Sequence, residues 1–293
     1  MTLTWALAAL GALVILACVV RGFVVEPWRI QHTVLELALP GVPPALAKAR
    51  IWFLTDLHMA GWGWRELWVA EKLRRHPPDL FLCTGDLLSG PGGVEPVLEL
   101  LGDLKPPLGC WYVRGNNEVE ELDPSSMFLE KLRGLGWAVL QNQHQRVRDA
   151  GGGWVIAGVD DPNNELDDID LALRDAPKDL FTILLSHTPE TFPDARDRGV
   201  HLTLAGHTHG GQVQLPWFGP IWGDTPRTGL RYVAGVFREA ASTLVVSRGI
   251  GWSLMPLRFL CLPELIELKL SAAPAPAPGT SAPARDSAPA GTP

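Results

Sequence analysis

Five short apolar segments of the chain are each followed closely by carboxylate, amide or imidazole side chains. In chain order the polar motifs are Asp56-Leu57-His58, Gly85-Asp86, Gly115-Asn116-Asn117-Glu118, Ser186-His187-Thr188-Pro189 and Gly206-His207-Thr208-His209-Gly210. The segments before them have the length and composition of buried β-strands. In open α/β sheets ligands bind at the carboxyl ends of the strands. The pattern therefore predicts that these polar side chains meet at one edge of a sheet.

Strand and helix patterns alternate along the middle of the chain. Strands are predicted at residues 51–54, 80–83, 111–113, 155–157, 181–185, 202–204, 232–234 and 244–246. Helices are predicted at 64–75 and at 94–104, and a third opens at Asp123, a typical N-cap before proline, and runs through Leu132. This order favours an α/β fold with a largely parallel sheet first and closer-spaced strands later.

The two ends of the chain differ from the middle. Residues 2–20 carry no charge, and a helix of that length just spans a hydrocarbon core of about 30 Å. A cleaved signal peptide is the alternative, but no basic residue precedes the apolar run. We expect a membrane anchor at 1–22, a linker and leading strand at 23–48, the main domain at 49–270, and a disordered Pro/Ala-rich tail at 271–293.

The charge around the apolar segment predicts its orientation. Arg21 and Arg29 follow the span, which by the positive-inside rule places the main domain in the cytoplasm, on a single-pass anchor in the inner (cell) membrane. The net charge of −7 argues against a nucleic-acid partner. Four cysteines are too few for a disulfide scaffold, and the absence of a C-x-x-C pair excludes a cysteine-based zinc site.

The polar motifs supply donors for transition metals. In Asp-x-His and His-x-His, alternate side chains point the same way if the backbone is extended, so each pair reaches one centre. The neighbouring glycines allow sharp turns and close approach. Oxygen and imidazole ligands suit Mn, Fe or Zn. Taken singly, each motif also fits a helix cap or a turn, whereas all five together favour a metal site.

The five motifs resemble the pattern D-x-H, G-D, G-N-H-[DE], H and G-H-x-H of the calcineurin-like metallophosphoesterases. The resemblance covers residues 49–270, and the last part of the chain is similar to the membrane-associated YkuE-like branch, which includes hydrolases of UDP-2,3-diacylglucosamine. It implies a four-layer α/β/β/α sandwich of two mixed sheets, here preceded by a transmembrane helix. It also implies two divalent metal ions, of which we favour Mn.

The resemblance also implies which residues hold each ion. Asp56, His58 and His209 would hold one metal, and Asn116, His187 and His207 would hold the other. Asp86 would bridge the two ions. Glu118 is left without a role, since orienting a ligand and capping the following segment fit it equally.

One position departs from the family pattern. The family carries a histidine that assists the leaving group where this chain has Asn117, which donates a hydrogen bond but supplies no proton at neutral pH. Asn117 therefore at most orients a phosphoryl oxygen, which favours cleavage of a pyrophosphate or diester bond. The leading substrate is UDP-2,3-diacylglucosamine or another lipid-linked phosphate. A general envelope phosphodiesterase or phosphatase, and a non-catalytic membrane binding module, are the alternatives.

Tryptophans follow the first and last metal motifs. Trp62 and Trp64 come after the first motif, and Trp217 and Trp222 come after the last. They form either an apolar rim beside the site or part of the buried core, and the core is favoured more for Trp64 than for Trp217. Trp217 and Arg248 are the predicted substrate contacts, since arginine geometry suits phosphate.

Overall fold

The computed structural model describes residues 3–122, 127–148 and 152–273. Two six-stranded sheets form the centre of this part of the chain. The first has the strand order β1-β14-β2-β3-β4-β5, and the second has the order β12-β13-β9-β8-β7-β6. Both sheets are mixed. In the first sheet β14 pairs antiparallel with β2 and the other pairings are parallel, whereas in the second sheet the pairings at both edges are antiparallel and those between them are parallel.

The strands of the first sheet are β1 (Gln31–Pro40), β2 (Ile51–Leu54), β3 (Leu80–Cys83), β4 (Cys110–Tyr112), β5 (Ala138–Val139) and β14 (Glu264–Ala273). Those of the second sheet are β6 (Gln143–Val147), β7 (Trp154–Gly158), β8 (Thr182–Leu185), β9 (Leu202–Ala205), β12 (Gly235–Glu239) and β13 (Ser242–Val246). A separate hairpin consists of β10 (Gln214–Leu215) and β11 (Gly219–Pro220).

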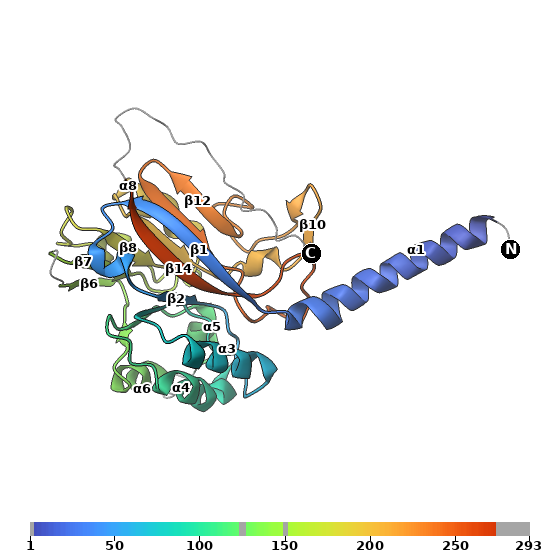
Figure 1. Ribbon diagram of the computed structural model, residues 1–293, viewed down its shortest axis with the longest axis horizontal. Helices are drawn as coiled ribbons and strands as arrows, with labels where there is room; N and C mark the ends of the chain where they lie inside the picture. Colours follow the sequence, from blue (N-terminus) through green and yellow to red (C-terminus); the bar gives the residue numbers. More distant parts are fainter. Residues whose placement is uncertain (1–2, 123–126, 149–151, 274–293) are drawn as a thin grey trace.

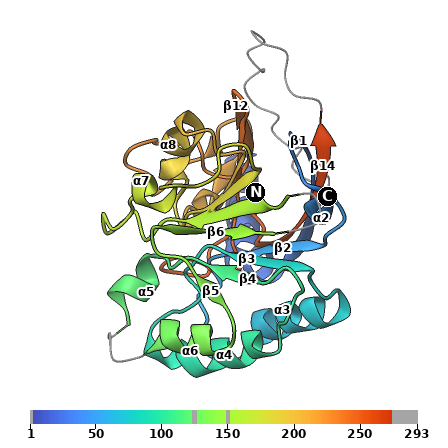
Figure 2. The ribbon, with the colours of Figure 1, turned by 90° about the vertical axis from the view of Figure 1, so that its left-hand side faces the viewer.

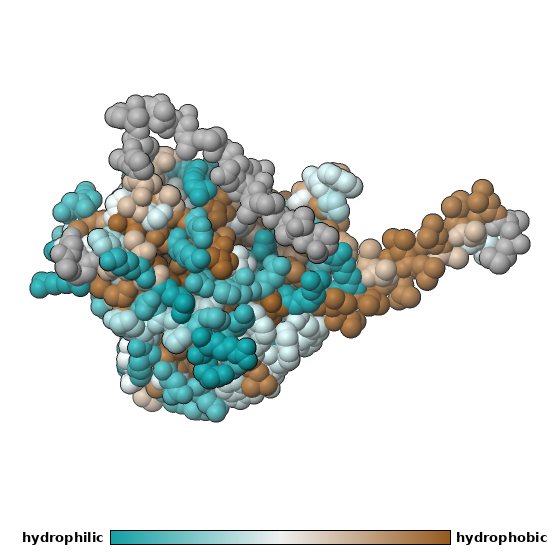
Figure 3. Space-filling model, viewed as in Figure 1, coloured by the Kyte–Doolittle hydropathy of each residue, from teal (hydrophilic) through white to brown (hydrophobic). Residues whose placement is uncertain are grey.

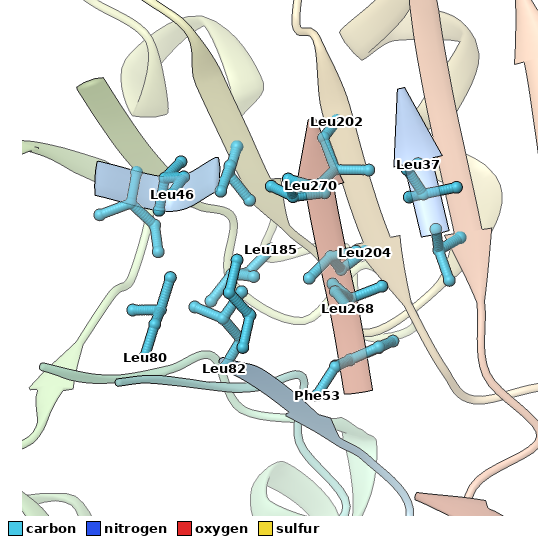
Figure 4. Packing of buried hydrophobic residues seen from close by; sticks show 14 of the residues in the cluster. Leu37, Leu46, Phe53, Leu80, Leu82, Leu185, Leu202, Leu204, Leu268 and Leu270 are labelled. Carbon is cyan, nitrogen blue, oxygen red and sulfur yellow. The ribbon is translucent and has the colours of Figure 1, made fainter. Parts of the chain in front are cut away.

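Helices cover the outer faces of the two sheets (Figure 2). The first sheet packs against α3 (Trp64–Arg75), α4 (Val94–Gly102) and α6 (Phe128–Gly134), and the second packs against α7 (Ile169–Ala172) and α8 (Phe192–Asp197). The facing sides are joined by a buried core in which Leu82 of β3 lies near Leu185 and Leu204 of the second sheet (Figure 4). The predicted four-layer α/β/β/α sandwich is confirmed.

Shorter helical segments connect these elements. They are α2 (Pro44–Ala47), α5 (Asn116–Glu120), η3 (Pro91–Gly93), η5 (Pro189–Thr191) and η6 (His209–Gly211). The helix α5 begins at a predicted metal ligand, Asn116, and η6 begins at another, His209.

The N-terminal helix projects away from the sandwich (Figure 1). It comprises α1 (Leu3–Val20), which buries none of its residues, followed by η1 (Arg21–Val25) and η2 (Glu26–Trp28). Its surface is apolar along nearly its whole length (Figure 3). The helical segment Leu3–Trp28 is long and apolar enough to cross a membrane.

Some predicted elements lie elsewhere in the structure. Residues 232–234 do not form a strand, because the Val233 carbonyl accepts a hydrogen bond from the Thr208 hydroxyl rather than from a neighbouring strand, and β12 begins only after them. The predicted helix start at Asp123 lies outside the described residues, and α6 begins at Phe128. Strand β14 continues past the predicted domain boundary at residue 270, while 274–293 lie outside the described residues.

Candidate metal centre

The predicted ligands come from the carboxyl ends of strands in both sheets. Asp56, Asp86 and Asn116 follow β2, β3 and β4 of the first sheet. His187 and His207 follow β8 and β9 of the second sheet. The remaining two ligands, His58 and His209, stand two residues beyond Asp56 and His207. Because the sheets pack face to face, the two rows of strand ends meet at one place.

The backbone carrying these ligands is not extended. Asp56, His58, Asp86, His207 and His209 all have positive φ angles, between 47° and 67°. The prediction that alternate side chains converge because of an extended backbone is therefore wrong. Instead the chain turns sharply at each ligand, in a conformation that costs energy for non-glycine residues and recurs at functional sites.

One group of donor atoms lies at the first strand end. The oxygen and nitrogen donors of Asp56, His58 and His209 all lie within 4.8 Å of one another. Nε2 of His58 is 3.2 Å from Nε2 of His209, and the latter is 3.7 Å from Oδ1 of Asp56. Oxygen and nitrogen atoms whose lone pairs point toward one another approach so closely only around a shared proton or cation. This group therefore fits the metal predicted to bind Asp56, His58 and His209.

A second group lies beside the first. Nε2 of His187 is 3.1 Å from Oδ1 of Asn116 and 3.2 Å from Nδ1 of His207. Oδ2 of Asp86 lies 3.4 Å from Nε2 of His187 and 3.6 Å from Nε2 of His58. Asp86 thus stands between the two groups, in the position expected of a carboxylate that bridges two cations.

Backbone carbonyls set which ring nitrogen faces the centre. Nδ1 of His187 donates to the Thr84 carbonyl at 2.7 Å, which leaves Nε2 free to bind. His207 is arranged in the opposite way, since Nε2 donates to the Asp224 carbonyl at 3.0 Å and Nδ1 faces the cluster. Such partners fix the tautomer and orientation of metal-ligating histidines, so both rings are prepared to bind.

The buried carboxylates of the cluster require a neighbouring positive charge. Burial raises the pKa of Asp56 to about 6. Burial also opposes charge on His187, but the carboxylates of Asp86 and Asp56 outweigh it and raise the pKa of that imidazole to about 10. Without a cation, the carboxylates therefore hold a proton on the ring. A divalent cation replaces that proton, and the donor set fits two such ions.

Two glycines allow the ligands to come this close. A Cβ atom on Gly115 would lie 2.2 Å from Oδ1 of Asp86, and one on Gly206 would lie 2.3 Å from Oδ2 of Asp56. Both distances are shorter than any real contact. The glycines of the G-N and G-H motifs are therefore required by packing against the carboxylates, as their place beside the ligands predicts.

Glu118 stabilises the two loops that carry Asp86 and Asn116. Its buried carboxylate accepts hydrogen bonds from the backbone N–H groups of Asp86, Leu87, Leu88 and Gly115, at distances between 2.7 and 3.2 Å. The sequence left its role open. The structure shows that it joins the loop after β3 to the start of α5, which holds Asp86 and Asn116 in place together.

Arg258 is a site residue that the sequence analysis missed. Its side chain is fully buried, and its guanidinium donates to the carbonyls of His209 at 2.9 Å, Arg248 at 2.8 Å and Gly251. It therefore fixes the loop that carries a metal ligand. Only its place in the apolar segment Pro256–Phe259 hinted at burial, and an isolated arginine in a sequence gives no sign of such contacts.

Asn117 lies beside a ligand of the first group. Its side-chain amide is 3.1 Å from Nδ1 of His58 and 3.2 Å from the Leu88 carbonyl, and its backbone N–H donates to Oδ1 of Asp86 at 2.9 Å. The side chain also lines the pocket above the cluster. Its side-chain oxygen also accepts a hydrogen bond from the Asn116 amide at 3.2 Å. The residue thus contacts three predicted ligands and lines the space where a substrate would bind.

The two residues predicted to contact the substrate, Arg248 and Trp217, do not line this pocket. The pocket is lined by ligands and by Asn117, Thr208, Gly211, Gln212, Trp222, Asp224 and Ser253, but not by Arg248 or Trp217. Arg248 pairs with Glu264 at 2.9 Å, and Trp217 stands at the tip of the β10–β11 hairpin. Trp62 and Trp64 are also exposed, so the expectation of core for Trp64 is wrong.

Comparison with known proteins agrees with this geometry. Residues 49–211 match the calcineurin-like phosphoesterase family. The chain is 31% identical to the uncharacterized metallophosphoesterase YkuE of Bacillus subtilis, over 82% of this chain and 85% of that protein. It is 29% identical to a transmembrane protein with metallophosphoesterase domain from Bos taurus, over 83% of this chain and 57% of that protein. The chain belongs to the calcineurin-like metallophosphoesterases.

Among solved structures, phosphopantetheinyl hydrolase from Mycobacterium tuberculosis superposes with a TM-score of 0.46 at 13% identity, over 71% of this chain and 94% of that one. Family membership makes the protein a phosphoester hydrolase with a site able to hold two metal ions.

Proposed function

We propose that the protein is a membrane-anchored hydrolase that cleaves a pyrophosphate or phosphodiester bond in a lipid-linked substrate. UDP-2,3-diacylglucosamine is the leading candidate, and Mn the favoured metal. The anchor would be the helix Leu3–Trp28, with the catalytic domain on the cytoplasmic side of the inner membrane.

The observation that carries the proposal is the place of Asn117. The side-chain amide contacts His58 and the Leu88 carbonyl, and it contains no group that ionises near neutral pH. A leaving group that needs a proton, such as an alkoxide, would receive none from this position. A phosphate leaving group needs none. The site therefore favours substrates whose leaving group is already acidic.

The chain's own residues have definite tasks in this reaction. Bound divalent cations supply Lewis acidity, which activates an attacking water and neutralises charge that develops on the phosphoryl oxygens. Asp86, held by Glu118 through its backbone, keeps the two ligand groups at a fixed separation. Asn117 holds the ring of His58, and its side chain lines the pocket in which a phosphoryl group would bind.

The test is release of UMP from UDP-2,3-diacylglucosamine by the purified full-length protein with added Mn. The His207→Ala variant is the blank, because it lacks one predicted ligand. Release by the unaltered protein alone supports the proposal. No release from folded, metal-loaded protein would exclude this substrate.

The same preparations should also be compared on two soluble substrates. Hydrolysis of bis-p-nitrophenyl phosphate is followed by the colour of p-nitrophenolate, and hydrolysis of an alkyl phosphate monoester by the release of inorganic phosphate. We expect hydrolysis of the diester to exceed that of the alkyl monoester at least tenfold. Equal rates would contradict the role assigned to Asn117, whatever the outcome with the lipid.

A further inference from the structure

Two loops at the mouth of the metal-site pocket expose large apolar side chains. We call this the apolar rim, and it consists of Leu215, Trp217, Phe218, Ile221 and Trp222 around the β10–β11 hairpin, and Leu254 and Met255 in a second loop. Trp217 is 99% exposed, Leu254 is 90% exposed and Phe218 is 83% exposed. Isolated exposed apolar residues are ordinary, but a group of this size marks an interaction surface.

The backbone conformation at the tips of the two loops is energetically unfavourable. Trp217 and Leu254 have φ angles of 67° and 61°, in the left-handed region that large side chains rarely adopt. Neither side chain gains burial in return. Packing inside the protein therefore does not explain why large apolar residues occupy these two positions. Contact with another molecule or with a membrane would explain it.

The second loop is attached to the base of the N-terminal helix. The backbone N–H of Arg258 donates to the Gly22 carbonyl at 2.9 Å. Gly22 packs so closely on Leu257 that a Cβ atom there would lie 3.0 Å from it. The rings of Trp28 and Trp252 meet edge to face, with centroids 5.5 Å apart. The loop that carries Leu254 therefore has a fixed position relative to the helix.

The hairpin is attached to the same place. The backbone N–H of Gln214 donates to the Phe259 carbonyl at 2.9 Å, and the N–H of Phe259 donates to the Gln212 carbonyl at 2.8 Å. The guanidinium of Arg21, at the end of the helix, lies 5.7 Å from the centre of the Phe259 ring. Figure 1 shows the hairpin at the end of the domain from which the helix projects.

We infer that the apolar rim is a second membrane contact, which inserts into the surface of the bilayer that the helix crosses. This inference rests on the proposed membrane anchoring. Tryptophan is enriched at the level of lipid headgroups, and both loops stand where the helix leaves the apolar span.

The inference also narrows the substrate class. Trp222 belongs to the apolar rim, and Ser253 precedes Leu254, yet both line the pocket above the metal ligands. With the rim in the bilayer surface, the pocket opens at the depth of the lipid phosphates. The site would then act on a phosphorylated lipid whose acyl chains remain in the membrane.

Fluorescent labels that respond to lipid-borne quenchers test the contact. Replacing Cys18 by serine removes the exposed native thiol, since the other three cysteines are buried. Single cysteines at Phe218 or Leu254 then carry an environment-sensitive label. Leu10 in α1 reports on the anchor, and Leu171 of α7 is the matched control. Helix α7 contacts β6, which Figure 1 shows at the end of the domain far from the N-terminal helix.

Each full-length labelled protein is reconstituted in vesicles of phosphatidylcholine and phosphatidylglycerol that contain a lipid with a nitroxide either near the headgroup or deep in the acyl chain. We expect at least twofold quenching of the labels at 218 and 254 by the headgroup nitroxide and of the label at 10 by the deep nitroxide, and little quenching at 171 by either. Circular dichroism checks that every variant is folded, which is expected because the altered side chains are exposed.

The alternative outcomes separate the two proposals. Quenching at 10 without quenching at 218 and 254 would overturn the apolar rim as a bilayer contact while leaving the anchor intact, and would be the result for a surface that binds another protein. Absence of quenching at all sites would overturn the anchor and the rim together. Neither result depends on turnover, so UMP release tests the enzymatic proposal separately.

Discussion

Oδ2 of Asp86 lies 3.4 Å from Nε2 of His187, although the two residues follow strands of different sheets. The same oxygen is 3.6 Å from Nε2 of His58. The centre therefore exists only when the two sheets pack against each other with their strand ends aligned. This dependence makes metal binding and the tertiary fold sensitive to the same residues.

Replacing Asp86 by asparagine should remove the charge that both ligand groups share. We expect hydrolysis and metal affinity to fall by more than about 100-fold, since even partners behind metal ligands change affinity by about 10–100-fold. Metal content after dialysis and the rate on bis-p-nitrophenyl phosphate measure the effect. Asp103→Asn, an exposed position far from the ligands in sequence, is the control. Two bound ions in the Asp86→Asn protein would rule out a bridging role.

Replacing Glu118 by glutamine should destabilise the protein. An N–H₂ group would face backbone donors that the carboxylate now accepts, and an unsatisfied buried donor costs about 1–3 kcal/mol. The free energy of unfolding in urea is the measurement. Glu36→Gln is the matched control, because its carboxylate is exposed beside Lys269. Equal stability of the two variants would show that the carboxylate does not hold the loop.

Arg258→Lys keeps the positive charge but loses the planar group that reaches three carbonyls. We expect a loss of about 3–5 kcal/mol in stability, as for buried charges deprived of partners, together with weaker metal binding through His209. Thermal unfolding with and without Mn measures both. The exposed pair Arg75–Glu71 offers the control Arg75→Lys, which should change little. If both variants unfold alike, Arg258 is dispensable.

Metal affinity should depend on pH in two steps. The ion must displace a proton from His187, whose neighbouring carboxylates outweigh its burial and raise its pKa to about 10, so affinity decreases as pH falls below that value. Burial raises the pKa of Asp56 to about 6, so a second proton competes below pH of about 6 and the dependence becomes steeper. Calorimetric titration with Mn between pH 5 and 8 measures the slope. A constant affinity over that range would contradict the assigned ligands.

Much of the fold is visible in the sequence because its signals are local. Apolar runs such as Ile51–Leu54 and Leu80–Cys83 appear as strands with the predicted bounds, since a short buried run without helical period fits little else. The strand predicted at 232–234 is absent from the structure, because an apolar segment can be buried without pairing in a sheet. Tyr232 packs against Phe192 and Phe237 without joining a sheet.

The types of the predicted ligands, their order and their position after strands follow from residue chemistry and hydrophobic pattern, so all three could be predicted from the sequence. The relative placement of the donor atoms depends on how the two sheets pack. Which atoms of His187 and His207 face the centre depends on carbonyls of distant loops. The support from Glu118 and Arg258 arises from contacts between segments far apart in the chain, and such contacts also place the hairpin that carries Trp217 outside the pocket. No local pattern encodes such contacts, because they form only when the two sheets and the loops between them pack together.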